Sequence, residues 1–423
     1  MLKPEDNERL VRVGPGTPAG NLFRRYWQPA LLSSELPEND GPPVRVRLLG
    51  EDLIAFRDSD GGVGLLDAFC PHRRAPLFFG RNEECGLRCV YHGWKFDRDG
   101  KCVDMPTEPP GNTLQAKVHI TSYPCIEKGG IIWTYMGPAE HKPAEPNYEW
   151  LRAPETHRFV SKTFENCNYL QALEGGLDTA HVSFLHNDNL SDKNWLPSQD
   201  GAPKLDVDMT DYGYCYVSTR KSRENKKYIR VYQYIMPYQQ MRGNVRGFGL
   251  EPPKYPKIDG HLWVPIDDVT TYVYNFMYSY DESSPIPLTY AKEYEAYAGR
   301  GDDDLIPGTF RLKQNQGNDY LIDRALQKTV SFTGVKGINT QDFALQENMG
   351  PIVDRSKEFL GSTDKAIVAM RRLLLEAIRD VEEGRSPRGL DPASHGGVRA
   401  HDSLLPADVD WRVELAADMA PRW

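Results

Sequence analysis

Apolar and polar residues alternate with a period of two along the first third of the chain. Residues 44–48 follow this pattern, residues 53–56 are apolar throughout, and residues 63–69 form a third apolar run after a glycine-containing turn. Side chains on one face of a β-strand recur at every second position, so these segments predict antiparallel strands. Together with a last strand near residues 130–136, they predict a small all-β domain over residues 41–138.

The later part of the chain predicts a larger domain that mixes strands and helices. Residues 214–218, 228–236 and 271–278 are rich in aromatic and β-branched residues, which suit a curved antiparallel sheet around a pocket. Residues 364–383 place apolar side chains three and four positions apart, as an amphipathic helix does. We therefore expect an α+β protein whose second domain covers residues 151–385.

Three further segments connect or flank these domains. Residues 1–40 are expected to form an N-terminal arm that packs on the second domain. Residues 139–150 are rich in proline and have no periodic pattern, so they predict a linker. Residues 386–423 contain several prolines and aspartates and predict an extended C-terminal tail.

Composition and charge narrow the class of protein. Hydrophobic residues make up 39% and charged residues 26% of the 423 residues, which is ordinary for a globular enzyme. The formal charge of −9 argues against a nucleic-acid partner. No apolar run reaches the ~18 residues that a membrane helix needs, and the N-terminus lacks a signal pattern. The seven cysteines show no disulfide framework, so we expect a soluble, cytoplasmic protein.

Two short cysteine–histidine pairs carry the chemistry of the first domain. Cys70 and His72 stand two positions apart, and Cys89 and His92 stand three apart. Two thiolates on one iron and two imidazoles on the other can hold a [2Fe–2S] cluster, and the neutral imidazoles raise its potential. A zinc site also accepts two cysteines and two histidines, but zinc fingers usually place both cysteines before both histidines. The alternating order here favours the cluster.

With these motifs the chain resembles the catalytic α subunits of Rieske non-haem iron ring-hydroxylating oxygenases. The resemblance implies an N-terminal all-β Rieske [2Fe–2S] domain, whose cluster is held by Cys70, His72, Cys89 and His92. It also implies a catalytic domain of the helix-grip, or START-like, kind that binds one mononuclear Fe(II). The cluster would receive single electrons from a partner reductase and pass them to this iron.

Residues 166–186 contain the pattern Asp-x-x-His-x-x-x-x-His of that family. Apolar residues three and four apart predict a helix here, with Asp178 and His181 on one side of it. His186 follows five residues after His181, so the helix has to end or distort between the two histidines. The resemblance implies that His181 and His186 are iron ligands and that Asp178 is the acidic bridge to the cluster of a neighbouring subunit.

The resemblance also requires one carboxylate ligand far along the sequence. The family places this ligand in a Gln-Asp word on a helix, which favours Asp342. Asp354 is the second candidate, although beside Arg355 it suits an ion pair or a helix cap. Glu347 is the remaining acid that could compete.

The sequence motifs around both iron-binding segments are similar to those of the phthalate dioxygenase-like branch of the family. That similarity implies a homotrimer or a hexamer of stacked trimers, served by an NADH-dependent flavin and iron–sulfur reductase. It implies that O₂ is used to hydroxylate a small aromatic substrate, with an aromatic carboxylate expected and either dihydroxylation or monooxygenation possible. The alternative is an aryl-ether-cleaving or O-demethylating monooxygenase. Glu174 stands where dioxygenases of the naphthalene type have asparagine, which leaves its contacts open.

Substrate-binding residues are suggested by three arginines. Arg220, Arg242 and Arg246 lie in or near strands expected to line the pocket, where a bidentate guanidinium would suit a carboxylate. Two other classes of protein remain open, an electron carrier without chemistry of its own and a zinc-bound structural or regulatory protein. The complete set of iron-site residues and the long second domain count against the electron carrier, and a red-brown colour would exclude the zinc protein.

Overall fold

The computed structural model describes residues 2–249, 251 and 253–423, which form two compact units. Residues 13–143 form one unit, and residues 1–12 together with residues 144–423 form the other. No helix among the described residues combines the length and the hydrophobicity needed to cross a membrane.

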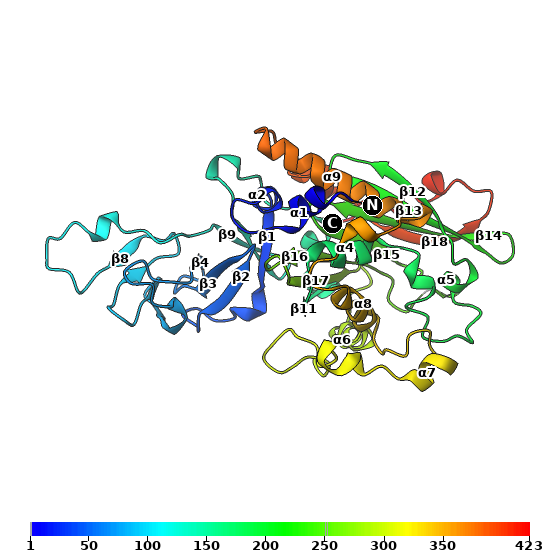
Figure 1. Ribbon diagram of the computed structural model, residues 1–423, viewed down its shortest axis with the longest axis horizontal. Coiled ribbons are helices and arrows are strands. Elements are labelled where there is room, and N and C mark those ends of the chain that lie inside the picture. Colours follow the sequence, from blue (N-terminus) through cyan, green and yellow to red (C-terminus); the bar gives the residue numbers. More distant parts are fainter. Residues whose placement is uncertain (1, 250, 252) are drawn as a thin grey trace. The chain divides into compact units, whose positions relative to one another are not determined.

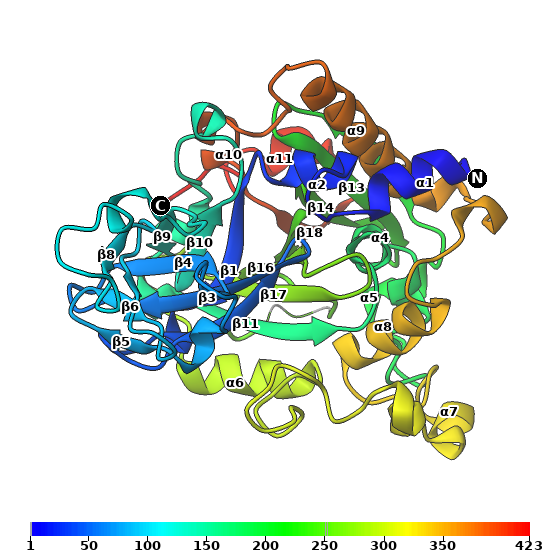
Figure 2. The ribbon, with the colours of Figure 1, turned by 60° about the vertical axis from the view of Figure 1, so that its left-hand side comes forward.

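The unit of residues 13–143 begins with α2 (Pro18–Phe23) and contains three small antiparallel sheets (Figure 2). They are β1 (Trp27–Leu32), β10 (Ile131–Tyr135) and β9 (Cys125–Lys128); β2 (Val44–Leu48), β3 (Glu51–Arg57) and β4 (Val63–Asp67); and β5 (Arg81–Glu83), β6 (Gly86–Arg88), β7 (Lys95–Phe96) and β8 (Cys102–Asp104). The alternating segments at residues 44–69 therefore form β2, β3 and β4, as predicted. Buried side chains such as Ile54, Phe56 and Leu87 pack in one cluster with Cys70 and Cys89.

The larger unit is built on an eight-stranded antiparallel sheet (Figure 1). Its order is β11 (Arg158–Glu165), β17 (Thr271–Tyr278), β16 (Lys257–Pro265), β15 (Gln239–Asn244), β14 (Lys226–Ile235), β13 (Gly213–Ser222) and β12 (Lys204–Met209), with β18 (His401–Pro406) beside β14. The helices are α1 (Pro4–Val11), α3 (Glu149–Arg152), α4 (Tyr169–Leu177), α5 (Leu196–Gln199), α6 (Leu288–Tyr297), α7 (Arg324–Thr329), α8 (Ile338–Gln346), α9 (Lys365–Glu382), α10 (Pro392–Gly396) and α11 (Trp411–Glu414). The predicted α+β fold class is confirmed.

The central strand β14 shows how the sheet divides its two faces. Ile229 and Val231 point to one face and pack with Trp411 and other apolar side chains. Arg230 and Tyr232 alternate with them and point to the opposite face, where they line a cavity. Both faces of this strand are therefore buried, but only one of them is apolar.

The helix α4 is fixed at its start and lies close against the sheet. The side chain of Asn168 accepts a hydrogen bond from the backbone N–H of Leu170 at 3.0 Å, which caps the helix. Near the other end, a Cβ on Gly176 would stand 2.0 Å from the ring of Trp263 on β16. Glycine is therefore required at this position for the helix to approach β16, and the approach sets the height of the following loop above the sheet.

The two terminal segments differ from those predicted from the sequence. Only residues 1–12 of the expected arm over residues 1–40 belong to the larger unit; the remainder, including α2 and β1, belongs to the smaller one. The expected tail over residues 386–423 is not simply extended, because it contributes β18 to the large sheet and two short helices. Sequence periodicity missed these elements because both helices are shorter than two turns and β18 spans only six residues. The two units divide at residues 143 and 144, inside the expected linker over residues 139–150.

Candidate active site

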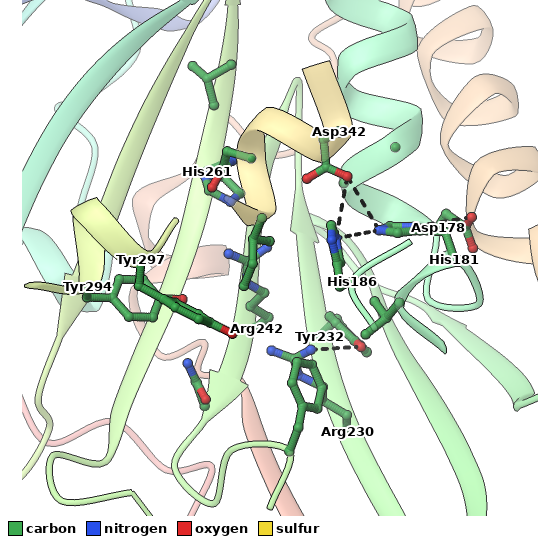
Figure 3. Close-up of a pocket in the computed structure, with 18 of the residues that line it drawn as sticks. Asp178, His181, His186, Arg230, Tyr232, Arg242, His261, Tyr294, Tyr297 and Asp342 are labelled. Atoms are coloured by element: carbon green, nitrogen blue, oxygen red, sulfur yellow. Dashed lines mark hydrogen bonds and ion pairs between the residues drawn. The ribbon is translucent and has the colours of Figure 1, made fainter. Parts of the chain in front are cut away.

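Two histidines and one aspartate meet above the large sheet. His181 opens a short 3₁₀ turn over residues 181–183, His186 lies in the loop that follows, and Asp342 lies on α8. Nε2 of His181 lies 3.1 Å from Nε2 of His186, and Oδ1 of Asp342 lies 3.7 and 3.5 Å from these nitrogens (Figure 3). Metal–nitrogen bonds of ~2.1 Å at right angles place donor atoms about 3 Å apart, so the trio fits one ion with open positions. Among the described residues, this is the one such group of three found.

The second nitrogen of each imidazole is held by its own partner. Nδ1 of His181 lies 3.3 Å from Oδ2 of Asp178, and Nδ1 of His186 lies 2.8 Å from Oε1 of Gln341. The amide nitrogen of Gln341 donates to Oδ1 of Asp188 at 2.7 Å, so its oxygen is turned toward His186. A hydrogen-bond acceptor at Nδ1 leaves the proton there and presents the Nε2 lone pair to a metal.

Burial and charge act differently on the two imidazoles. Burial lowers the pKa of His186, which favours the neutral form that ligates metals. Burial also opposes protonation of His181, but the hydrogen bond to Asp178 and the charges of Asp178 and Asp342 together outweigh it and raise the pKa of His181. Asp178 therefore stabilises positive charge on the His181 ring, and with a metal at Nε2 it would make this imidazole the stronger donor.

The two competing carboxylates are engaged elsewhere. Asp354 is exposed, accepts a hydrogen bond from the backbone N–H of Ser356 at 3.1 Å and pairs with Lys357 at 3.0 Å. Glu347 is buried and accepts hydrogen bonds from the backbone N–H of Asn166 and from the hydroxyl of Tyr320. The structure therefore brings Asp342, and neither Asp354 nor Glu347, to the two histidines.

The local structure around Asp178 differs from the predicted helix. α4 ends at Leu177, Asp178 is its C-terminal cap with φ −69° and ψ 129°, and His181 lies in the separate 3₁₀ turn. The predicted common helix for Asp178 and His181 is therefore wrong. The chain leaves the helix because Oδ1 of Asp178 accepts the backbone N–H of Ala180 at 2.8 Å, an Asx turn that competes with helical hydrogen bonds. The side chains of Asp178 and His181, three residues apart, nevertheless contact each other.

Glu174 belongs to a buried ion cluster. Its carboxylate pairs with Nε of Arg355 at 2.9 Å and with Nε of Arg371 at 2.7 Å. Arg371 also contacts Glu358. Burial would raise the pKa of Glu174, but the two arginines outweigh this effect and lower it. The cluster ties α4 to α9 and to the segment after α8, so it fixes the two segments that carry the trio.

The two cysteine–histidine loops of the smaller unit have the same backbone pattern. In the first loop the N–H of Cys70 donates to the carbonyl of Ala75 at 2.8 Å, and in the second the N–H of Cys89 donates to that of Trp94 at 2.8 Å. Gly93 has φ 77°, which the second turn needs. Two equivalent turns thus present one cysteine and one histidine each.

The two cysteines of these loops share one buried cluster, and the two histidine rings lie side by side. Cys70 and Cys89 are buried, whereas His72 is exposed and His92 half-buried. The two imidazole rings lie 4.4 Å apart, and His72 stacks on Trp94. Burial raises the pKa of the Cys70 thiol to about 12, so a cation has to hold this sulfur as a thiolate. Buried thiols beside accessible imidazoles suit a cluster with its histidine-bound iron near the surface.

A cavity of about 270 Å³ opens beside the metal-site trio. Aromatic side chains make up much of its wall, among them Trp195, Tyr232, Trp263, Tyr294, Tyr297 and Phe343. Figure 3 shows that Arg230 and Arg242 lie across the cavity from Asp342. An apolar wall with a few charged groups is typical of a pocket for a small organic molecule.

Of the three arginines suggested by the sequence, one lines this cavity. Arg242 does so, and its Nε donates to Oδ1 of Asp259 at 2.6 Å. Arg220 is buried away from the cavity, where it donates to backbone carbonyls such as that of Asp200 at 2.8 Å, and Arg246 does not line the cavity either. A strand turns alternate residues to opposite faces, and the sequence does not tell which face holds the pocket.

Sequence reasoning missed Arg230, Lys257, His261 and Gln341. The first three line the cavity from β14 and β16, and Gln341 holds His186. The available signal was a polar residue at every second position in strands that otherwise consist of apolar and aromatic residues. His261 is buried, and burial lowers its pKa well below the usual range.

Comparison with known proteins identifies the class. The Rieske [2Fe-2S] domain family matches residues 26–124, and the family described as LigXa C-terminal domain like matches residues 134–421. The chain therefore belongs to the Rieske oxygenase α subunits. Its cofactors are a Rieske [2Fe–2S] cluster and mononuclear iron, and it is the oxygenase subunit of a multicomponent system that receives electrons from partner proteins.

Individual relatives cover nearly the whole chain. The phthalate 4,5-dioxygenase oxygenase subunit of Pseudomonas putida is 39% identical and matches 97% of this chain and 94% of its own length. The 3-chlorobenzoate-3,4-dioxygenase oxygenase subunit of Comamonas testosteroni is also 39% identical, with 97% of both chains matched. The crystal structure of dicamba monooxygenase bound to dicamba has the same fold at 17% identity, with a TM-score of 0.62 over 86% of this chain and 99% of that one.

Proposed function

We propose that this chain is the terminal oxygenase for an aromatic carboxylate, with its Fe(II) held by His181, His186 and Asp342. The observation that carries the proposal is the convergence of these three side chains within 3.1–3.7 Å of one another beside an aromatic cavity. Cys70, His72, Cys89 and His92 hold the Rieske cluster. Ferrous iron with three protein ligands keeps open positions for O₂ chemistry, and the cluster supplies single electrons.

The protein's own residues position the ligands and exclude water. Asp178 and Gln341 each hold the Nδ1 side of one histidine, which fixes the ring plane and the donor nitrogen. The aromatic wall, with Trp195 and Trp263, holds a substrate ring and keeps bulk water away from the metal site. Arg242 directs cationic charge toward the cavity, which favours an anionic substrate.

Two kinds of observation support a carboxylate substrate. The relatives that are 39% identical are named for phthalate and 3-chlorobenzoate, both of which are aromatic carboxylates. The cavity is lined by cationic side chains in an otherwise aromatic wall. The test is a product screen in which purified protein, NADH and a surrogate reductase are supplied with phthalate, 3-chlorobenzoate and methoxybenzoates.

A hydroxylated product from the carboxylates is expected. Release of formaldehyde from methoxybenzoates, without ring hydroxylation, would instead establish the alternative O-demethylase activity. Turnover of neutral aromatic compounds with no carboxylate oxidised would refute the substrate class.

The working assembly is proposed to be a homotrimer, or a hexamer of stacked trimers, served by an NADH-dependent flavin and iron–sulfur reductase. Asp178 already binds His181, and its carboxylate is proposed to reach a cluster histidine, His92, of the adjacent subunit. Chains with Cys89→Ser and chains with His181→Ala would each lack one metal centre. Their co-expressed mixed trimers should regain activity, whereas verified mixed trimers that stay inactive would exclude electron transfer between subunits.

A further inference from the structure

Among the residues that the structure describes, two buried cations of the cavity lack a carboxylate partner. Arg230 on β14 is 5% exposed and Lys257 on β16 is 2% exposed. Nε of Arg230 donates to the carbonyl of Gly243 at 2.9 Å, and Nζ of Lys257 donates to the hydroxyl of Tyr290 at 3.2 Å. In the part of the chain that the structure describes, no ion pair joins either cation to an acidic side chain. Burying a charge without an opposite charge is costly, so an anion that enters the cavity beside these two groups is stabilised there.

The carboxylates nearest to Lys257 are already engaged. Asp259 accepts from Arg242 at 2.6 Å, from Asn244 at 3.1 Å and from Tyr294 at 3.2 Å. Asp402, on β18, accepts from the hydroxyl of Tyr228 at 2.8 Å and from two backbone N–H groups.

The cluster as a whole keeps a net positive charge. Arg230, Arg242 and Lys257 are three cations against the two anions Asp259 and Asp402, so one positive charge remains while Lys257 is protonated. This surplus is buried and borders the cavity, where an anion from outside can balance it.

The ammonium group of Lys257 lies against two tyrosine rings of the cavity wall. Its Nζ lies 4.0 Å from the centre of the Tyr294 ring and 5.5 Å from that of Tyr290, both on α6. Aromatic faces stabilise a cation without neutralising it. Lys257 is also paired with Asn244 across β15 and β16, so both end at the same part of the cavity wall.

We propose that Arg230 and Lys257 form an anion subsite, distinct from the metal site, that binds the carboxylate of an aromatic substrate and sets the specificity of the cavity. This inference rests on the proposed function and names the residues that recognise the substrate. A carboxylate placed there removes the net positive charge of the cluster and exchanges two unpaired cations for charge-assisted hydrogen bonds. A neutral ring compound of the same shape gains neither.

The subsite predicts a dependence of affinity on pH. Burial lowers the pKa of Lys257 to about 8, against the opposing pull of Asp259 and Asp402. Lys257 is therefore charged at pH 7 and neutral above pH 9. A bound carboxylate raises this pKa, so binding of the carboxylate takes up protons above pH 8 and weakens by up to about tenfold for each further pH unit.

The test is the anaerobic binding of phthalate and of its neutral dimethyl ester to the holoenzyme, measured by titration calorimetry without a reductase. In wild-type protein the Kd of phthalate should be constant from about pH 6.5 to 7.5, where both carboxylates are ionised, and rise above pH 8, while the Kd of the ester stays flat. Lys257→Met keeps most of the unbranched side chain but removes its charge, and should raise the phthalate Kd at least tenfold at pH 7, with no pH dependence left. Lys292→Met, on the exposed side of α6, is the matched control and should match wild type.

Each outcome decides between the two proposals. If phthalate binds to wild type with a flat pH profile, or equally well to Lys257→Met, the subsite is refuted although the carboxylate substrate stands. If the ester binds and phthalate does not, the carboxylate substrate itself is refuted. Should Lys257→Met fail to retain the cluster spectrum, Arg230→Gln and the wild-type pH profile test the same site, and the absence of both effects would refute it.

Discussion

Replacing Gln341 by leucine tests how the protein fixes His186 as a ligand. Gln341 is 1% exposed, and its Oε1 accepts the Nδ1 proton of His186 at 2.8 Å. Leucine has a similar volume but no acceptor, so the imidazole loses the partner that fixes its ring plane and tautomer. Loss of such a partner typically weakens metal binding about 10–100-fold, or roughly 1.4–2.7 kcal/mol.

The assay is Fe(II) binding to protein from which the mononuclear iron has been removed, measured by competition with a chelator. The visible spectrum of the cluster reports whether the smaller unit is intact. Gln346→Leu is the matched control, because Gln346 is a buried glutamine on the same helix and no hydrogen bond joins its side chain to either histidine in the described structure. Wild-type iron affinity in Gln341→Leu, or an equal loss in both variants, would refute the proposed role of the hydrogen bond.

Three further predictions concern charge. Asp342→Asn should lower the content of mononuclear iron sharply and Asp354→Asn should not, as measured by metal analysis; the reverse result would move the third ligand to Asp354. Glu174→Gln leaves the buried Arg355 without its carboxylate partner, while Arg371 keeps Glu358, and should cost about 3–5 kcal/mol in urea unfolding, against less than ~0.5 kcal/mol for Glu376→Gln in an exposed helical pair. Burial opposes ionisation of Glu149, but the ion pair with Arg399 and the other hydrogen bonds to this carboxylate outweigh burial and lower its pKa. Wild-type protein should therefore lose stability as the pH falls below about 4.5, measured by urea unfolding. Glu149→Gln should lose less stability over the same pH range.

The exposed pair of Glu376 and Arg372 serves as the control because it makes the same kind of ion pair at the protein surface. Glu376 pairs with Arg372 at 2.7 Å on the solvent side of α9, where water screens the interaction. Glu174 makes the same kind of contact in the interior. A similar cost for both variants would mean that the buried cluster has no special role in fixing the metal-site segments.

The sequence by itself determined the features that depend on neighbouring residues. The ligand spacings of Cys70 and His72 and of His181 and His186 are local, so a short turn brings each pair together whatever the rest of the fold does. Strands β2, β3 and β4 were predicted for the same reason, since alternation is read over five to seven residues. The helix that ends at Leu177 was predicted too long. An Asx turn at Asp178 replaces the helical hydrogen bonds there, and the spacing of apolar residues does not reveal such a turn.

Tertiary structure alone decided which distant side chains share the site. Asp342 stands more than 150 residues from His186, and only family resemblance, not periodicity, placed it there. Arg230 and Lys257 face the cavity because β14, β15 and β16 are neighbours in the sheet and turn the same alternate residues inward. Arg220 obeys the same alternation on β13 but bonds to backbone carbonyls outside the cavity. A sequence gives the period of a strand; the strand order and the face that closes over the pocket come from packing, and these decide whether a cation is available to a substrate.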